Sequence, residues 1–451
     1  MPAAVSAHAP SLRRELGPRH LTLFAIAAVT GTRPIAEAAH AGPGSVALWI
    51  LATIGVLLPL ASACAVLTAR SPGSGGLYTW ARDAFGPWHG FLCFWIYWTG
   101  IAFWFPGAAM LYVSVGIYGL GPNYAHLADD RFCVLAVSLG AIWIALGTNL
   151  VGLRIGKWTE NLGAVSGWLL CVVLSMAALT VWLRGGSATQ MRLLPEWNRT
   201  TASFWPNIAL GLTGIELVGM LGGEIVDPAR NVPRASWVAS VFAAVFYISM
   251  TLALLVLMRA DSISELYGLA QGGGAAARML DMPGLGPLVA ALVVGNAIGQ
   301  FGSCGTAVSR LPLAAGVDHL LPSVFARVHP RWATPHYSIL LLGIVASVLI
   351  VAVQTGDSLR GAYQALVSLM VIGSFLPFLY VYACAWKARR RLTAVTGMLV
   401  TIAVLACSAI PTGSVRSVWI FEAKLAAGAL VMIGSAWLVY RSRRRQISAG
   451  V

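Results

Sequence analysis

The chain has 451 residues, of which 58% are hydrophobic and only 10% are charged, and its formal net charge is +14. Since a soluble globular domain carries about 25% charged residues, this composition excludes an ordinary water-soluble protein. The excess of Lys and Arg is typical of the cytoplasmic loops of membrane proteins. No basic segment outside the apolar runs is interleaved with aromatic residues, so we expect a lipid bilayer and no nucleic acid as partner.

Apolar runs of about 20 residues, the length that crosses a bilayer as a helix, follow one another along the chain. Turn residues and charges separate twelve of them, which predicts an all-α membrane protein with twelve transmembrane helices. No small-residue cleavage site follows the first run, so we expect that run to be retained. The predicted segments are 21–40, 44–69, 88–119, 131–151, 157–183, 202–225, 235–259, 284–312, 336–354, 361–386, 393–411 and 417–440.

The basic residues predict the orientation. With twelve spans both termini lie on one side, which carries twenty of the thirty Lys and Arg residues, whereas the other side carries eight. This bias predicts cytoplasmic termini, and the short loops suggest the inner membrane of a bacterium. The predicted parts are a cytoplasmic tail (1–20), a transporter core of ten helices (21–386), helices eleven and twelve (387–440) and a basic cytoplasmic tail (441–451).

Two segments contain residues that interrupt helices. Proline removes a backbone donor, and glycine lowers the cost of leaving helical geometry. The motifs are Gly31, Thr32, Arg33 and Pro34 in the first segment, and Gly211, Leu212, Thr213 and Gly214 in the sixth. Breaks five helices apart indicate an inverted-repeat transporter, with segments one to five repeated as six to ten and a binding site between the breaks. Close helix packing at small residues is the alternative.

Several motifs in chain order resemble those of the amino acid–polyamine–organocation transporter superfamily. After the second segment, Pro72 to Trp80 is similar to P-x-x-G-G-x-Y-x-W. In and after the sixth segment, Gly214 to Glu216 is similar to G-x-E, and Glu224 to Ala235 to E-x-x-x-P-x-R-x-x-P-R-A. Beyond the eighth segment, Ser309 to Pro322 is similar to S-R-x-x-x-A-x-x-x-D-x-x-L-P, and Thr334-Pro335 follows.

This resemblance implies the LeuT-type fold, a 5+5 inverted repeat with broken helices 1 and 6 followed by two further helices. It also implies an amino acid or amine carrier. The chain departs from the family at Arg33, where a second glycine is usual. Charge at this depth normally faces a cavity or a partner. Arg33 either meets a substrate carboxylate or pairs with Glu37 one helical turn away, and it argues against polyamine substrates.

Further candidates lie outside the two motifs. Some proton-coupled relatives of this family carry a lysine in the fifth segment, where this chain has Gly167. Glu216, beside the sixth-segment break, is the remaining candidate for coupling, and its alternative role is to hold the broken helix by hydrogen bonds. Additional substrate-binding candidates are Trp104 in the third segment, Ser303 in the eighth and Tyr363 in the tenth.

We therefore expect a secondary active transporter of amino acids that works by alternating access, as an exchanger or driven by protons. The alternatives are a sensor that binds an amino acid without moving it, and a carrier of another small organic anion such as a dicarboxylate. The seven cysteines lack paired or metal-like spacing, and no H-E-x-x-H or G-x-S-x-G motif is present. We expect no enzyme, metal, cofactor or disulfide.

Overall fold

The computed structural model describes residues 14–121, 123–192, 194, 199–354, 359–410 and 418–448. Within these residues the regular structure is helical, apart from two isolated bridges that join single residues. The helices are α1 (Pro18–Val29), α2 (Arg33–His40), α3 (Ser45–Ala52), α4 (Leu58–Arg70), α5 (Leu77–Phe85), α6 (Pro87–Gly119), α7 (Arg131–Leu150), α8 (Leu153–Gly185), α9 (Arg199–Gly211), α10 (Glu216–Met220), α11 (Pro228–Leu257), α12 (Gly268–Leu280), α13 (Leu285–Val308), α14 (Arg310–Val317), α15 (His336–Gln354), α16 (Leu359–Lys387), α17 (Arg391–Ser408) and α18 (Val418–Ser448). A π-helical turn joins α3 to α4, and short 3-10 turns are Ala125–Ala128, Gly222–Glu224, Ala260–Ser262 and Ser323–Ala326.

Long apolar helices dominate the molecule. Among the described residues, 9 helical stretches are long and apolar enough to cross a membrane. They are Ser45–Arg70, Pro87–Gly119, Arg131–Leu150, Gly156–Gly185, Pro228–Leu257, Leu285–Val317, Val367–Lys387, Arg391–Ser408 and Leu425–Gln446. A shorter apolar helix spans His336–Ala352. The described residues therefore form an all-helical structure, with the repeated long apolar helices that are typical of a multi-pass membrane protein.

Each predicted apolar segment lies on a helix or on an interrupted helix. The first segment is divided between α1 and α2, and the sixth between α9 and α10, so both interruptions occur at the predicted motifs. Two helices were not predicted. Helix α5 is a short amphipathic helix, and α12 contains three consecutive glycines, which have a poor helix propensity. Packing against α13 stabilises α12 in spite of this composition.

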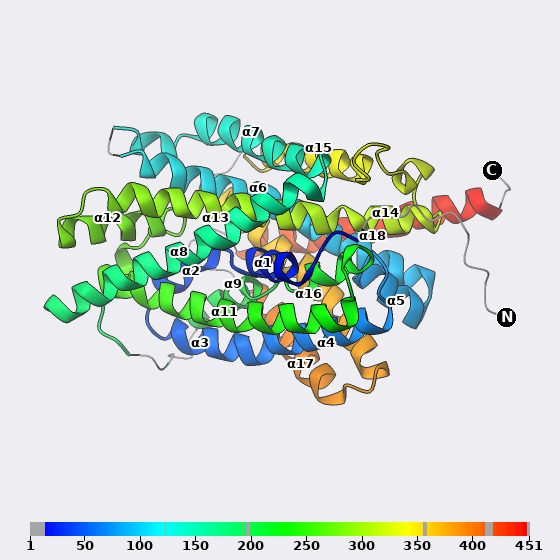
Figure 1. Ribbon diagram of the computed structural model, residues 1–451, viewed down its shortest axis with the longest axis horizontal. Helices are drawn as coiled ribbons and strands as arrows, with labels where there is room; N and C mark the ends of the chain where they lie inside the picture. Colours follow the sequence, from blue (N-terminus) through cyan, green and yellow to red (C-terminus); the bar gives the residue numbers. More distant parts are fainter. Residues whose placement is uncertain are drawn as a thin grey trace.

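The long helices run side by side as a bundle, with α7 and α15 along one edge and α4 and α17 along the other (Figure 1). Helix α13 packs against α8 and α6, and α16 packs against α6. Helix α1 lies near the middle of the bundle (Figure 1), where it contacts α8, α11 and α13. The interrupted first segment is therefore surrounded by other helices and kept from the lipid-facing surface.

Paired glycines let the central helices approach closely. A Cβ atom on Gly163 of α8 would lie 2.4 Å from the Cα of Gly299 in α13. A Cβ atom on Gly373 of α16 would lie 2.4 Å from the Cα of Gly100 in α6. Small residues at such contacts increase van der Waals packing between membrane helices, where water does not drive association. These two contacts fix the helices that surround the interruptions.

Candidate functional site

The two helix interruptions lie against each other in the centre of the bundle. A Cβ atom on Gly211 would meet the Pro34 side chain at 2.6 Å, and one on Gly214 would meet the carbonyl oxygen of Ala28 at 2.4 Å. Gly214 also has φ +112°, in the left-handed region that favours glycine. Both the backbone conformation and the available space therefore require glycine at this position.

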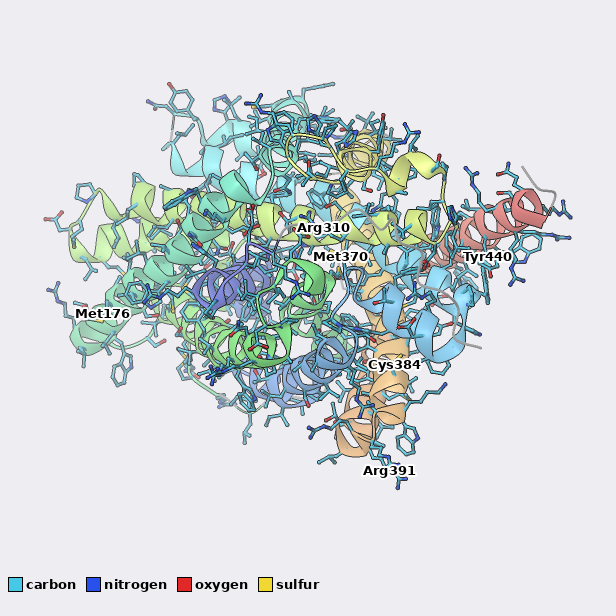
Figure 2. The ribbon with its side chains drawn as sticks, turned by 45° about the vertical axis from the view of Figure 1, so that its right-hand side comes forward. Met176, Arg310, Met370, Cys384, Arg391 and Tyr440 are labelled. Atoms are coloured by element: carbon cyan, nitrogen blue, oxygen red, sulfur yellow. The ribbon has the colours of Figure 1, made fainter. Side chains whose placement is uncertain are left out.

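A small, partly open cavity lies where the interruptions meet. Its volume is about 50 Å³, which is room for a few waters or a small solute group. Met370, labelled near the middle of Figure 2, contributes to its wall from α16. The lining residues are Ala28, Gly31, Arg33, Pro34, Tyr97, Ile101, Trp104, Leu210, Gly211, Thr213, Gly214, Glu216, Leu217, Tyr247, Gln300, Cys304, Met370 and Ser374.

The Tyr247 hydroxyl links both interruptions. It accepts a hydrogen bond from the Gly31 amide at 3.0 Å. The same hydroxyl lies 2.8 Å from the Val29 carbonyl and 2.7 Å from the Gly211 carbonyl, so its one proton can be donated to either. The Tyr247 ring stacks on Trp49, with centroids 4.4 Å apart. A side chain of α11 thus satisfies backbone groups that the ends of α1 and α9 leave without helical partners.

Glu216 ties the second interruption to α6. One carboxylate oxygen accepts a hydrogen bond from the Tyr97 hydroxyl at 2.7 Å, and the other accepts from the Gly214 amide at 2.8 Å. The residue is only 2% exposed, and no basic side chain pairs with it among the described residues. A buried carboxylate without a cationic partner is costly unless it is hydrogen-bonded or protonated, and the bonds from Tyr97 and Gly214 supply such hydrogen bonds to both oxygens.

Arg33 contributes the positive charge of the cavity. It is the first residue of α2, and its guanidinium lies 3.6 Å from the Glu37 carboxylate on the next turn of the same helix. Both side chains are almost completely buried. Arg33 also lines the cavity, so pairing with Glu37 and facing the cavity are compatible in this structure.

The sequence-predicted candidates divide into three groups. Eight line the cavity, namely Gly31, Arg33, Pro34, Trp104, Gly211, Thr213, Gly214 and Glu216. Three are buried nearby without being among its lining residues, namely Thr32, Leu212 and Ser303. The side chain of Tyr363 lies outside the described part of the chain.

Several lining residues were not predicted as site residues. Tyr97 and Tyr247 each provide a hydroxyl to the interruptions, and Gln300 reaches Gly31 from α13. A single tyrosine in an apolar segment is a weak signal, because most such residues are explained by packing. Only the arrangement of the helices brings these side chains to the cavity.

A second buried polar cluster joins the end of the sixth segment to α14. The Arg310 guanidinium pairs with Glu224 through contacts of 2.8 and 3.0 Å, and it donates to the Thr306 carbonyl at 2.6 Å. Both residues of the pair are buried, with side chains 2% and 3% exposed. Arg310 is labelled on its helix in Figure 2. This pair connects a short segment that follows the second interruption to the rest of the bundle.

A third polar contact joins α5 to the residue that follows α14. The Tyr78 hydroxyl and the Arg82 guanidinium both donate to the Asp318 carboxylate. Burial, followed by the hydrogen bond to Asp318, raises the pKa of Tyr78, so the phenol stays protonated and remains a donor at neutral pH. The contact therefore holds α5 to α14 across the neutral pH range.

The chain is similar to known transporters over most of its length. The sequence model of the family described as amino acid permease matches residues 16–412. An uncharacterized transporter of Legionella pneumophila is 24% identical over 452 residues, which cover 95% of this chain and 97% of that protein.

Two relatives have names that include a substrate. A serine/threonine exchanger of Bacillus subtilis is 24% identical over 352 residues, which cover 73% of this chain and 74% of the exchanger. A probable agmatine/putrescine antiporter of Lactococcus lactis is 23% identical over 347 residues, which cover 76% of this chain and 72% of the antiporter. Since the family model covers far more than half of the sequence, the chain belongs to the amino acid permease family, within the amino acid–polyamine–organocation superfamily, and is a membrane transporter and not an enzyme.

Proposed function

We propose that the protein is a secondary active transporter of amino acids, working by alternating access as an exchanger or with proton coupling. The observation that carries this proposal is the cavity between the two helix interruptions. The positive end of α2 and the Arg33 guanidinium favour a carboxylate there. Gly211 and the Glu216 carboxylate, which both line the cavity, favour an ammonium group. A zwitterionic solute matches both kinds of group.

The proposed architecture has twelve membrane spans with both termini in the cytoplasm of a bacterium, in its inner membrane. Nine of the twelve spans would be the nine long stretches. The other three would be α15 and the interrupted pairs α1–α2 and α9–α10. Residues 21–386 would hold the two five-helix repeats of a LeuT-type fold, and residues 387–440 the last two spans. Interrupted helices at corresponding positions of two repeats, with a site near the bilayer midplane, are the recurring design of such carriers. Residues 1–20 and 441–451 would be cytoplasmic tails.

Arg33 supports a substrate with at least one carboxylate. Buried beside the cavity, this cation would repel a polyamine and would attract an anion more strongly than a neutral backbone does. The proposed substrate class is therefore an amino acid, as for the serine/threonine exchanger, in preference to the amine substrates of the agmatine/putrescine antiporter. A small organic anion such as a dicarboxylate is the second candidate, because it would use the same guanidinium.

Neutralising the buried pair tests the role of Arg33 without leaving a lone buried charge. We expect amino acids to raise the melting temperature of the purified protein in detergent, since a ligand of the native state stabilises it by mass action. The variant Arg33→Gln/Glu37→Gln should fold but bind about 10- to 100-fold more weakly, which corresponds to one charged hydrogen bond. Glu37→Gln alone keeps the guanidinium without its counter-charge, so this variant should be less stable than the double variant but should still bind. Equal affinity in the double variant and the unmodified protein would exclude Arg33 from the substrate site.

Glu216→Gln tests the proposed coupling role of this carboxyl. Glutamine can preserve both hydrogen bonds, by donating to the Tyr97 hydroxyl and accepting from the Gly214 amide. We expect a folded variant that still exchanges internal for external substrate but no longer accumulates substrate when an inward proton gradient is imposed. Uptake would be measured in proteoliposomes at two external pH values. Gradient-driven uptake as large as that of the unmodified protein would leave Glu216 with the helix-holding role alone.

A further inference from the structure

Gln300 brings an amide group from α13 to the first interruption. The residue is half-buried and lines the central cavity together with Gly31 and Arg33. A Cβ atom on Gly31 would lie 2.3 Å from the Gln300 side-chain nitrogen Nε2, 3.1 Å from the amide carbon and 3.2 Å from the amide oxygen. The nitrogen is therefore the atom of this amide that lies nearest to the side-chain position of Gly31.

The Tyr112 hydroxyl fixes the orientation of this amide. Tyr112 lies on α6, which packs against α13, and its hydroxyl donates to the Gln300 oxygen Oε1 at 2.6 Å. Tyr112 is buried, and its ring packs against Phe301 with the ring centroids 6.1 Å apart. Because the oxygen of the planar amide is held by Tyr112, the two N–H groups of Nε2 are directed away from that hydroxyl and toward the first interruption.

The N–H groups of Gln300 are available to a solute. In the part of the chain that the structure describes, the Gln300 amide makes its hydrogen bond through the oxygen, and Nε2 makes none. The nearby Gly31 amide is already bonded to the Tyr247 hydroxyl. Packing over Gly31 would explain an apolar side chain of this length. It does not explain an amide that is held with its acceptor occupied and its donors unbound, because unbound donors in a protein interior cost free energy.

A carboxylate is the solute group that matches this arrangement. Arg33 lines the same cavity, so a guanidinium and an amide N–H group lie at one small site. A carboxylate has about four acceptor positions and can bind both groups at once. An ammonium group has only donors and cannot use Nε2. The Glu216 carboxylate, which also lines the cavity, is the matching partner for an ammonium group.

We propose that Gln300 is a specificity-determining residue, which donates a hydrogen bond to the carboxylate of the substrate, and that Tyr112 is the residue that positions it. This inference rests on the proposed transport function. It assigns the carboxylate end of an amino acid to the side of the cavity formed by Arg33 and Gln300, and the ammonium end to the side formed by Glu216. A solute that lacks the carboxylate loses the bond to Gln300 and binds more weakly.

Gln300→Glu tests the role of the donor. Glutamate keeps an acceptor for the Tyr112 hydroxyl but places a carboxylate oxygen where Nε2 was. Binding of each of the twenty common amino acids, and of the same compounds with the carboxylate converted to a neutral amide, would be measured from the melting temperature of the full-length protein in detergent. We expect the amino acid that binds best to lose about 100-fold or more in affinity, because like charges repel at close distance. Its neutral amide should lose at least about tenfold less.

A second glutamine provides the matched control. Gln271 lies on α12, and its side-chain oxygen accepts a hydrogen bond from the Ser264 amide at 2.8 Å, a bond that glutamate also makes. Gln271 is not among the residues that line the cavity. Gln271→Glu adds the same charge to the protein and should change amino-acid affinity less than about threefold. A loss as large as that in Gln300→Glu would reduce the effect to net charge and overturn the proposal.

A double-mutant cycle tests the positioning role of Tyr112. Gln300→Met removes the amide and should weaken binding about tenfold. Tyr112→Phe leaves the amide free to turn and should weaken binding about threefold to tenfold in the presence of Gln300. The same change should cost less than about twofold in the Gln300→Met protein, because no amide is left to position. Equal losses in the two backgrounds would make Tyr112 a packing residue only and overturn its positioning role.

Two further outcomes separate this inference from the proposed function. Affinity that is unchanged in Gln300→Met would overturn the inference and leave the transport proposal standing, and this variant decides if Gln300→Glu fails to fold. Absence of stabilisation of the unmodified protein by any amino acid or dicarboxylate would overturn both proposals together.

Discussion

Gly214→Ala should destabilise the protein by about 2 to 4 kcal/mol and abolish substrate binding. The residue has φ +112°, which disfavours any Cβ atom, and that atom would lie 2.4 Å from the Ala28 carbonyl oxygen. The atom that the new Cβ would contact belongs to the backbone of α1 and not to a flexible side chain, so the two interruptions must move apart. The Gly214 amide would then lose its bond to Glu216. The measurement is the melting temperature with and without substrate.

A glycine in open space provides the matched control. Gly140 lies within α7, and a Cβ atom there would meet nothing within 4 Å. Gly140→Ala should therefore leave binding unchanged and alter stability by about 1 kcal/mol or less, in the stabilising direction, because alanine is the better helix former. If Gly214→Ala behaves like this control, the contact between the two interruptions does not define the site.

Removing one partner of the Arg310–Glu224 pair should have the second large effect. Glu224→Gln leaves a buried guanidinium without its counter-charge and should destabilise the protein by about 3 to 5 kcal/mol. The double variant Glu224→Leu/Arg310→Met removes both charges and should recover most of this loss, because apolar residues of similar size avoid the desolvation of two ions. Thermal unfolding of the three proteins in the same detergent measures both effects.

An exposed ion pair serves as the comparison for this prediction. Arg259 and Asp261 are 75% and 69% exposed and lie 3.1 Å apart. Asp261→Asn should leave the melting temperature almost unchanged, since exposed pairs are well solvated. If Glu224→Gln is as mild as Asp261→Asn, the buried pair does not anchor the segment after the second interruption.

The sequence predicted the helices well because the apolar periodicity and the Gly and Pro punctuation are local signals. The break between α1 and α2 follows from Gly31 and Pro34, and the break between α9 and α10 from Gly211 and Gly214. Helix α12 was missed since its glycines have low propensity. It is helical because Gly273 allows close packing on Val289 of α13, and such a tertiary contact cannot be derived from one segment.

The candidate site was only partly predictable for the same reason. Residues within the two motifs could be named, but the Tyr247 hydroxyl reaches Gly31 from a position 216 residues away. Ser303 shows that the sequence does not reveal which side of a buried helix faces the cavity, because its neighbour Cys304 lines the cavity while Ser303 does not. Successive residues are rotated by about 100° around a helix. An apolar segment that is buried on most sides gives little indication of its rotational orientation. The orientation and the number of spans stay predictions.

Counterflow in proteoliposomes tests the transport proposal most directly. Vesicles that contain the purified protein would be loaded with unlabelled amino acids or left empty, and uptake of labelled amino acids would be followed, with and without an inward proton gradient. We predict rapid uptake in loaded vesicles or in vesicles with the gradient, and its loss in Gly214→Ala. Amino acids that stabilise the purified protein but enter the vesicles under none of these conditions would contradict transport and indicate a protein that binds its ligand without moving it.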